Sequence, residues 1–113
     1  MPKQDHYQIG QLTDAAYLVL LTLTVPCHGY LIMAKIEALT DGSVRMGPAS
    51  LYTTLKKLTD AGFIRLMAEE DAKKVYHITD DGLEALRAEI GKRERYVKYG
   101  KRAMKEYLEE NHE

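Results

Sequence analysis

The sequence predicts a mainly α-helical (α+β) fold: a winged helix-turn-helix with a two-stranded β-hairpin wing and a long C-terminal dimerisation helix. Three observations predict it. Apolar residues recur at helical spacing before residue 62, two short extended runs flank a polar tip, and a capped helical segment continues to about residue 110. We expect residues 1–79 to form the winged-helix DNA-binding domain and residues 80–113 the dimerisation helix.

The composition is that of one folded domain. The chain has 113 residues, of which 45% are hydrophobic and 29% are charged. A single cysteine, Cys27, excludes an internal disulfide framework, and the N-terminus lacks a signal pattern. The longest apolar stretch, residues 15–23, is too short to span a bilayer. We therefore expect a cytoplasmic protein that needs no cofactor, no metal and no membrane.

The first helix is expected to be buried on most sides. Thr13 is a suitable N-cap, and Asp14 lies in the first turn, where the helix dipole favours an acid. Residues 15–24 read AAYLVLLTLT, which is apolar nearly all round. A helix so apolar in so short a chain suggests that a second subunit covers part of it. Val25-Pro26 ends it.

A second helix is expected from about Gly29 to Leu39. Leu31, Ala34, Ile36 and Leu39 give it roughly helical apolar spacing.

The third helix carries the functional hypothesis. It starts at Gly47-Pro48, and Leu51, Leu55 and Leu58 form one apolar stripe. The opposite side presents Ala49, Ser50, Thr53, Lys56, Lys57 and Asp60, with Tyr52 at its edge. Small, hydroxyl and basic side chains suit a helix that enters the major groove of DNA. A solvated helix face is the alternative. The net charge of the chain is −1, but residues 43–66 carry a local charge of +3, which includes Arg45.

The wing is expected to consist of Phe63–Ala68 and Lys73–Ile78, separated by the polar tip 69–72. Ile64, Leu66 and Ala68 alternate onto one face. Lys73 and Lys74 could pair with phosphates, but Glu69, Glu70 and Asp71 lie beside them, so the sequence leaves open whether the wing contacts DNA.

Three segments together resemble one known family. Residues 12–36 (LTDAAYLVLLTLTVPCHGYLIMAKI), 49–64 (ASLYTTLKKLTDAGFI) and 75–86 (VYHITDDGLEAL) are similar to the PadR-like transcriptional regulators. The resemblance implies a homodimeric repressor that binds a palindromic operator and is often released by a small aromatic or phenolic effector. Carried over by position, it places the DNA-reading residues at Ser50, Tyr52, Thr53, Thr54, Lys56 and Lys57.

The last helix carries half of a coiled-coil seam. Leu83, Ile90, Val97 and Met104 recur every seventh residue, with Leu86, Arg93, Gly100 and Tyr107 as a mixed companion row. A helix of this length exceeds what so small a domain can cover, although packing on its own domain is the alternative. The predicted dimer residues are Leu83, Leu86, Ile90, Val97, Met104 and Tyr107. The basic residues between 92 and 105 form either a phosphate-contacting or a solvated face.

Tyr17, Tyr96 and Tyr99 are candidates for an aromatic effector pocket, with core or interface packing as the alternative reading. No phosphate loop, zinc spacing or nucleophile triad is present, so we expect no enzyme. The alternative function is a winged-helix protein-interaction module without DNA binding, which the near-neutral charge and the acidic wing tip favour.

Overall fold

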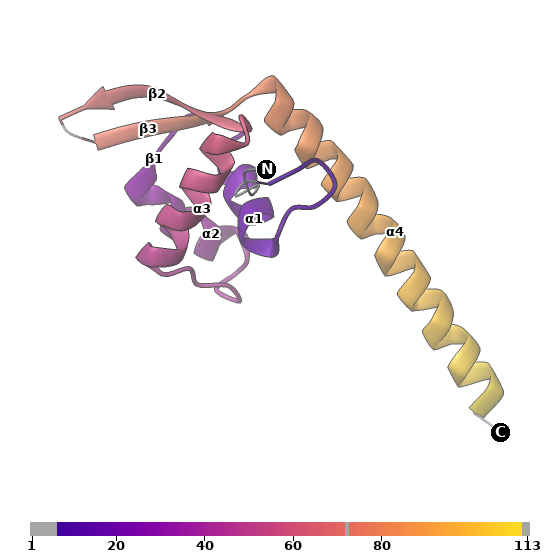
Figure 1. Cartoon of the computed structure of the whole chain (residues 1–113). Coiled ribbons are helices and arrows are strands. Elements are labelled where there is room, and N and C mark those ends of the chain that lie inside the picture. Colours follow the sequence, from indigo (N-terminus) through magenta and orange to yellow (C-terminus); the bar gives the residue numbers. More distant parts are fainter. Residues whose placement is uncertain (1–6, 72, 112–113) are drawn as a thin grey trace.

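Helices and a small sheet form a body from which one long helix projects (Figure 1). The computed structural model describes residues 7–71 and 73–111. In chain order the elements are α1 (Asp14–Thr22), β1 (Cys27–His28), the 3-10 helix η1 (Gly29–Leu31), α2 (Ile32–Leu39), α3 (Pro48–Asp60), β2 (Ile64–Glu70), β3 (Lys73–Ile78) and α4 (Asp80–Asn111). The molecule measures 65 × 38 × 23 Å because α4 extends far beyond the body. The predicted winged helix-turn-helix is confirmed.

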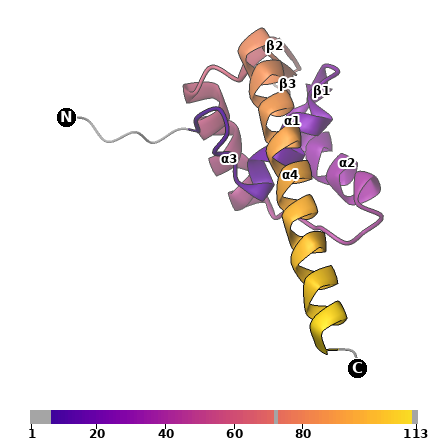
Figure 2. The same ribbon diagram turned by 90° about the vertical axis from the view of Figure 1, so that its right-hand side faces the viewer.

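Helix α1 lies at the centre of the body, between α3 and α2 (Figure 2). The Thr13 Oγ1 accepts a hydrogen bond from the Ala16 N–H at 3.1 Å, as an N-cap does. Val19, Leu20 and the C-capping Leu23 are fully buried. The helix ends two residues before the predicted Thr24, whose hydroxyl donates to the Leu21 carbonyl just past the helix end.

The second helix differs from its prediction. It opens with the 3-10 turn η1, and its buried side chains are Ile32 and Ile36, at an i, i+4 spacing. Leu31 and Leu39, which belong to the apolar spacing of the predicted helix, are 39% and 54% exposed. Both isoleucines belong to the core, in which α2 packs against α1.

Helix α3 forms as predicted. Pro48 occupies the first helical position after the N-cap Gly47, and Leu51, Leu55 and Leu58 are buried. Gly62 has φ of 80° and ends the helix in a Schellman arrangement, in which the Phe63 N–H donates to the Leu58 carbonyl at 3.0 Å.

The sheet has a strand that the sequence did not indicate. Its order is β1-β3-β2, all antiparallel, and Cys27 of the short β1 is in register with Tyr76 of β3. Two residues are too few to show an alternating pattern. The expected alternation holds for Ile64 and Leu66 but is wrong for Ala68, because the pairing shifts between Leu66 and Ala68. Ile64 is buried, whereas Leu66 is 45% exposed. Ala72 of the predicted tip lies outside the described residues.

The first turns of α4 belong to the core. Thr79 accepts from the Gly82 N–H at 3.0 Å and donates to the Gly62 carbonyl, so it caps α4 and fixes α4 to the end of α3. Leu86 is only 6% exposed and is buried within its own chain, which removes it from the predicted dimer face. The division of the chain at residues 79 and 80 stays a prediction.

Candidate nucleic-acid interface

The outward face of α3 is the candidate reading surface. Ser50, Tyr52, Thr53 and Lys56 are exposed on it, and the three leucines on the other side hold the helix against α1. α3 lies at the edge of the body, with one side free of the other elements (Figure 2). The structure therefore brings most of the predicted reading residues together on one helix.

Thr54 does not belong to this face. It is 4% exposed, because it lies three residues after Leu51 and four before Leu58 and so falls on their stripe. Its assignment to the DNA-reading set is wrong.

The two lysines of α3 have different surroundings. Lys56 Nζ lies 2.7 Å from Asp60 Oδ2, in an exposed i, i+4 ion pair. Such pairs contribute little to stability, so a phosphate can displace the aspartate. Lys57 is half-buried, and its Nζ lies 6.0 Å from the centroid of the Tyr7 ring. The first lysine is thus partly neutralised by an acid, whereas the second lies over an uncharged ring.

Arg45 lies in the link that leads into α3. Its side chain is 78% exposed and lies 3.4 Å from Glu37 of α2. It is therefore free to reach a nucleic acid beside α3 at the cost of one exposed ion pair.

The wing lysines are exposed, but their neighbours do not favour phosphate. Lys74 is in register with Glu69, and Lys73 Nζ lies 5.1 Å from the ring centroid of Tyr30. β2 and β3 extend past the end of α3 and away from it (Figure 1). We therefore regard α3, and not the wing, as the main candidate surface.

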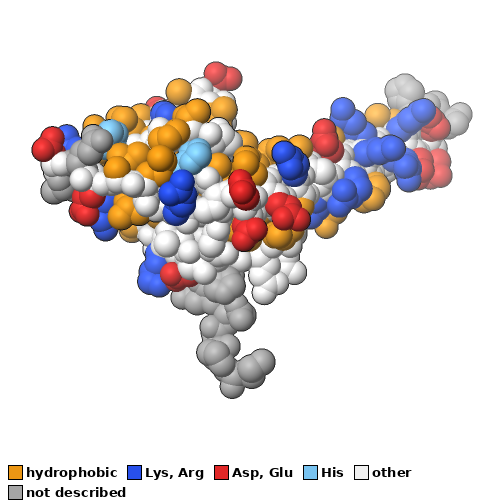
Figure 3. Space-filling model, turned by 90° about the horizontal axis from the view of Figure 1, so that it is seen from above, with side chains coloured by type: hydrophobic (Ala, Val, Ile, Leu, Met, Phe, Trp, Pro, Cys, Tyr) orange, Lys and Arg blue, Asp and Glu red, His pale blue; other side chains and the backbone are white. Residues whose placement is uncertain are grey.

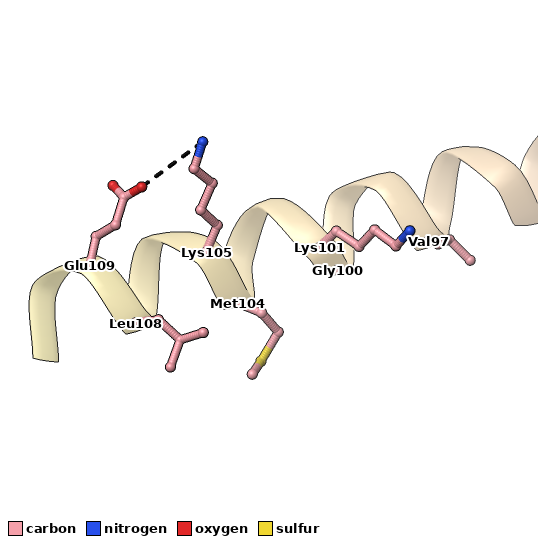
Figure 4. Close-up of a pocket in the computed structure, with 7 residues that line it drawn as sticks. All are labelled: Val97, Gly100, Lys101, Met104, Lys105, Leu108 and Glu109. Atoms are coloured by element: carbon pink, nitrogen blue, oxygen red, sulfur yellow. Dashed lines mark ion pairs between the residues drawn. The ribbon is translucent and has the colours of Figure 1, made fainter. Parts of the chain in front are cut away.

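The distal part of α4 carries an unpaired apolar stripe. Leu83 and Ile90 are 37% and 38% exposed, and Val97, Met104 and Tyr107 are more than half exposed. An open groove of about 800 Å³ lies along Val97, Gly100, Lys101, Met104, Lys105, Leu108 and Glu109. Met104 and Leu108 project from one side of the helix, and the Lys105–Glu109 ion pair from the other (Figure 4). Basic side chains gather along the same part of α4 (Figure 3).

Arg93 of the predicted companion row is committed to its own chain. It donates to Glu89 Oε2 at 2.8 Å and lies 2.9 Å from Asp14, and its guanidinium lies 4.4 Å from the centroid of Tyr17.

Glu89 is fully buried and also accepts from the Leu12 backbone N–H at 3.2 Å. Burial raises the pKa of Glu89, but hydrogen bonds from Arg93, Leu12 and Lys92 outweigh burial and leave the pKa below its ordinary value. Sequence reasoning missed this cluster, although the i, i+4 spacing of Glu89 and Arg93 was a signal for it.

The three tyrosines proposed for an effector pocket are not gathered around one cavity. Arg93 covers the Tyr17 ring, while Tyr96 and Tyr99 are 62% and 51% exposed with ring centroids 6.3 Å apart. None of the three lines the groove on α4.

Cys27 is buried, with 4% of its surface exposed. Among the described residues, no helix combines the length and the apolar character needed to cross a membrane.

The fold and the exposed α3 define the class of winged helix-turn-helix proteins. The sequence model of the transcriptional regulator PadR-like family matches residues 18–88, and the chain belongs to this family. The family consists of transcriptional regulators and not of enzymes.

Similar proteins agree with this assignment. The chain is 36% identical over 59 residues to the transcriptional regulator YqjI of Escherichia coli. The matched region covers 52% of this chain and 28% of YqjI. It is 38% identical over 77 residues to an uncharacterised 37.1 kDa protein of transposon TN4556 from Streptomyces fradiae, covering 67% of this chain and 22% of that protein. The chain thus spans about a quarter of the length of these relatives.

Solved structures of other regulators are similar to this fold. A transcriptional regulator from Clostridium thermocellum superimposes with a TM-score of 0.71 at 22% identity, covering 78% of this chain and 87% of that one. Bacillus subtilis PadR in complex with operator DNA gives a TM-score of 0.56 at 30% identity, covering 66% of this chain and 45% of PadR.

Proposed function

We propose that this protein represses transcription in the cytoplasm by binding a palindromic operator as a homodimer, with the N-terminal half of α3 in the major groove. The observation that carries the proposal is the outward face of α3: Ser50, Thr53 and Lys56 are exposed on a helix that buried leucines hold in place. Small residues at the start of the helix permit close approach, and hydroxyls and lysines can reach base edges and phosphates. The N-terminus of the helix also attracts an anion.

A related structure supports the same assignment. Bacillus subtilis PadR, which is 30% identical over the shared region, was crystallised in complex with operator DNA. The similarity covers 66% of this chain.

The groove on α4 fits a second α4. Val97, Gly100, Lys101 and Met104 lie at i, i+3, i+4 and i+7, the diamond that receives one side chain in knobs-into-holes packing. Lys101, Met104, Lys105 and Leu108 form the next diamond. Nothing lies within 4 Å of the position a Cβ would take at Gly100, so the first hole is deep enough for a long side chain such as Met104 of a partner subunit.

Charge favours an antiparallel pair. Basic residues occupy positions 92–105 of α4, whereas Glu106, Glu109 and Glu110 follow them. With Met104 in the first hole, facing residues have numbers that add to about 204. The acidic end of one α4 then lies at the level of the basic middle of the other, whereas a parallel pair would place each charged segment at the level of its own copy.

We also propose that a small aromatic effector releases the protein from its operator. This proposal rests on the family resemblance and on the exposed rings of Tyr96 and Tyr99, whose centroids lie 6.3 Å apart. An aromatic molecule can stack on such a pair of rings. A molecule bound on α4 would change the separation of the two reading helices.

A gel-shift assay tests DNA binding. The probe is the DNA upstream of the protein's own gene, because such regulators often control neighbouring genes, and a scrambled duplex of the same composition is the control. We expect retardation of the upstream probe at protein concentrations that leave the scrambled duplex free. Equal retardation of both probes, or of neither at low salt, rejects sequence-specific repression.

The second candidate is a protein-interaction module on the same fold. The wing favours it, because Glu69 lies opposite Lys74 in register and Lys73 is engaged by Tyr30. A probe that is not retarded at low salt, together with a dimeric protein, would favour this candidate over the repressor.

A further inference from the structure

The segment before α1 connects two elements that the proposed function uses separately. Residues 7–12 run from the surface of α3 to the middle of α4, and we call this segment the strap. Figure 2 shows its described part beside α3 on the way to α1. One end of the strap contacts α4, and the other contacts α3.

One end of the strap is fixed to α4. The Leu12 N–H donates to the buried Glu89 carboxylate at 3.2 Å, and Lys92 Nζ donates to the Gly10 carbonyl at 2.9 Å. The Leu12 side chain is itself 5% exposed in the core. A buried carboxylate is costly unless its oxygens are satisfied, and the backbone of the strap supplies one of the donors. The strap is therefore part of the ionic cluster on α4.

The other end of the strap lies against α3. Tyr7 packs partly on the core, and its ring centroid lies 6.0 Å from Lys57 Nζ, within the range of a cation–π contact. Among the described residues, Lys57 forms no ion pair, in contrast to Lys56 with Asp60. An aromatic ring orients an ammonium group and leaves its charge in place. A carboxylate orients the ammonium group and also neutralises its charge. Lys57 therefore keeps its full charge for a phosphate.

We propose that Tyr7 is a positioning residue for Lys57, and that Glu89 and Lys92 of α4 hold the strap so that it can act. The proposal rests on the DNA-binding role of α3. It makes the aim of one lysine of the reading helix depend on two residues of the long helix. A disturbance of α4 would thereby reach the DNA-binding surface through six residues of backbone.

The geometry can be tested without DNA. The ring of Tyr7, lying over Lys57, shifts the ¹H resonances of the Lys57 ε-methylene upfield in an NMR spectrum. We expect the shift to persist in Tyr7→Phe, to disappear in Tyr7→Leu, and to shrink in Lys92→Met, which cuts the tie to Gly10. Lys98→Met, on the exposed side of α4, is the matched control and should leave it unchanged. A Lys57 shift that survives Tyr7→Leu, or one that Lys92→Met does not alter, overturns the proposal.

The effect on DNA is tested by a double-mutant cycle on operator affinity. We expect Tyr7→Leu to weaken binding about two- to fivefold, Tyr7→Phe to restore it, and Tyr7→Leu to have no further effect in a Lys57→Met background. Equal losses in both backgrounds would show that Tyr7 acts through the fold and not through Lys57, which overturns the positioning role. A wild-type protein that does not bind the operator instead refutes the proposed function, while the NMR measurement still decides the geometry.

Discussion

The buried carboxylate of Glu89 accepts a hydrogen bond from the backbone N–H of Leu12, 77 residues earlier in the chain, at 3.2 Å. This bond links the start of the winged-helix body to the long helix α4. The same carboxylate accepts from Arg93, which also pairs with Asp14 at the start of α1. The long helix is thus held to the body by ionic contacts as well as by apolar packing.

Glu89→Gln should reduce the free energy of unfolding by about 1 to 3 kcal/mol at pH 7, because an amide replaces the buried charged group that accepts hydrogen bonds from Leu12 and Arg93. Chemical denaturation measures this loss. Glu109→Gln, which breaks only the exposed pair with Lys105, is the control and should have almost no effect. Equal stability of the two variants would show that the buried cluster does not hold α4.

The pH dependence of stability should follow from the same group. The pKa of Glu89 is lowered in the folded protein, so its contribution is present above the unfolded value of about 4.3. That contribution is lost as the pH falls through the folded pKa. Denaturation curves between pH 7 and pH 3 should show a larger loss of stability for the wild type than for Glu89→Gln. Parallel profiles would mean that another carboxylate dominates.

Gly82→Ala should destabilise the protein by about 1 to 3 kcal/mol or more. A Cβ at this position would overlap the Phe63 carbonyl oxygen, so α4 must shift. Gly91→Ala is the matched control on the same helix: its Cβ would meet only the end of the Arg95 side chain at 3.5 Å. That variant should be neutral or slightly stabilising, since alanine favours a helix. Thermal unfolding compares the two, and a stable Gly82→Ala protein would contradict the close packing of α4 on the body.

The antiparallel pairing of α4 predicts which cysteines can be cross-linked between subunits. In a Cys27→Ala background, two Met104→Cys residues should lie about 5 Å apart along the helix axis, and two Val97→Cys residues about 16 Å apart. A short bismaleimide should therefore join Met104→Cys dimers and not Val97→Cys dimers, as read on a denaturing gel. Efficient joining of both variants indicates a parallel pair, and joining of neither indicates that α4 does not pair with α4.

Sequence reasoning succeeded where local chemistry decides the structure. The caps at Thr13 and Thr79 and the stripe of Leu51, Leu55 and Leu58 depend on residues within a few positions of one another. The same stripe could have shown that Thr54 is buried, because its spacing from Leu51 and Leu58 is helical.

The remaining features depend on contacts distant in the sequence. β1 exists because Cys27 pairs with Tyr76, and Leu86 is buried because α4 begins against the body. The ionic cluster joins Leu12 and Asp14 to residues near 90, and only the Glu89–Arg93 spacing hints at it. Such contacts leave no periodic pattern in one sequence.

The salt dependence of operator binding tests the central claim most directly. Fluorescence anisotropy across a range of salt concentrations gives the slope of log K against log salt, which counts the phosphates contacted. Lys56→Ala/Lys57→Ala should bind more weakly and have a slope shallower by about 2, whereas Lys98→Ala/Arg102→Ala on α4 should match the wild type. An unchanged affinity and slope in the α3 variant would contradict the assignment of α3 as the reading helix.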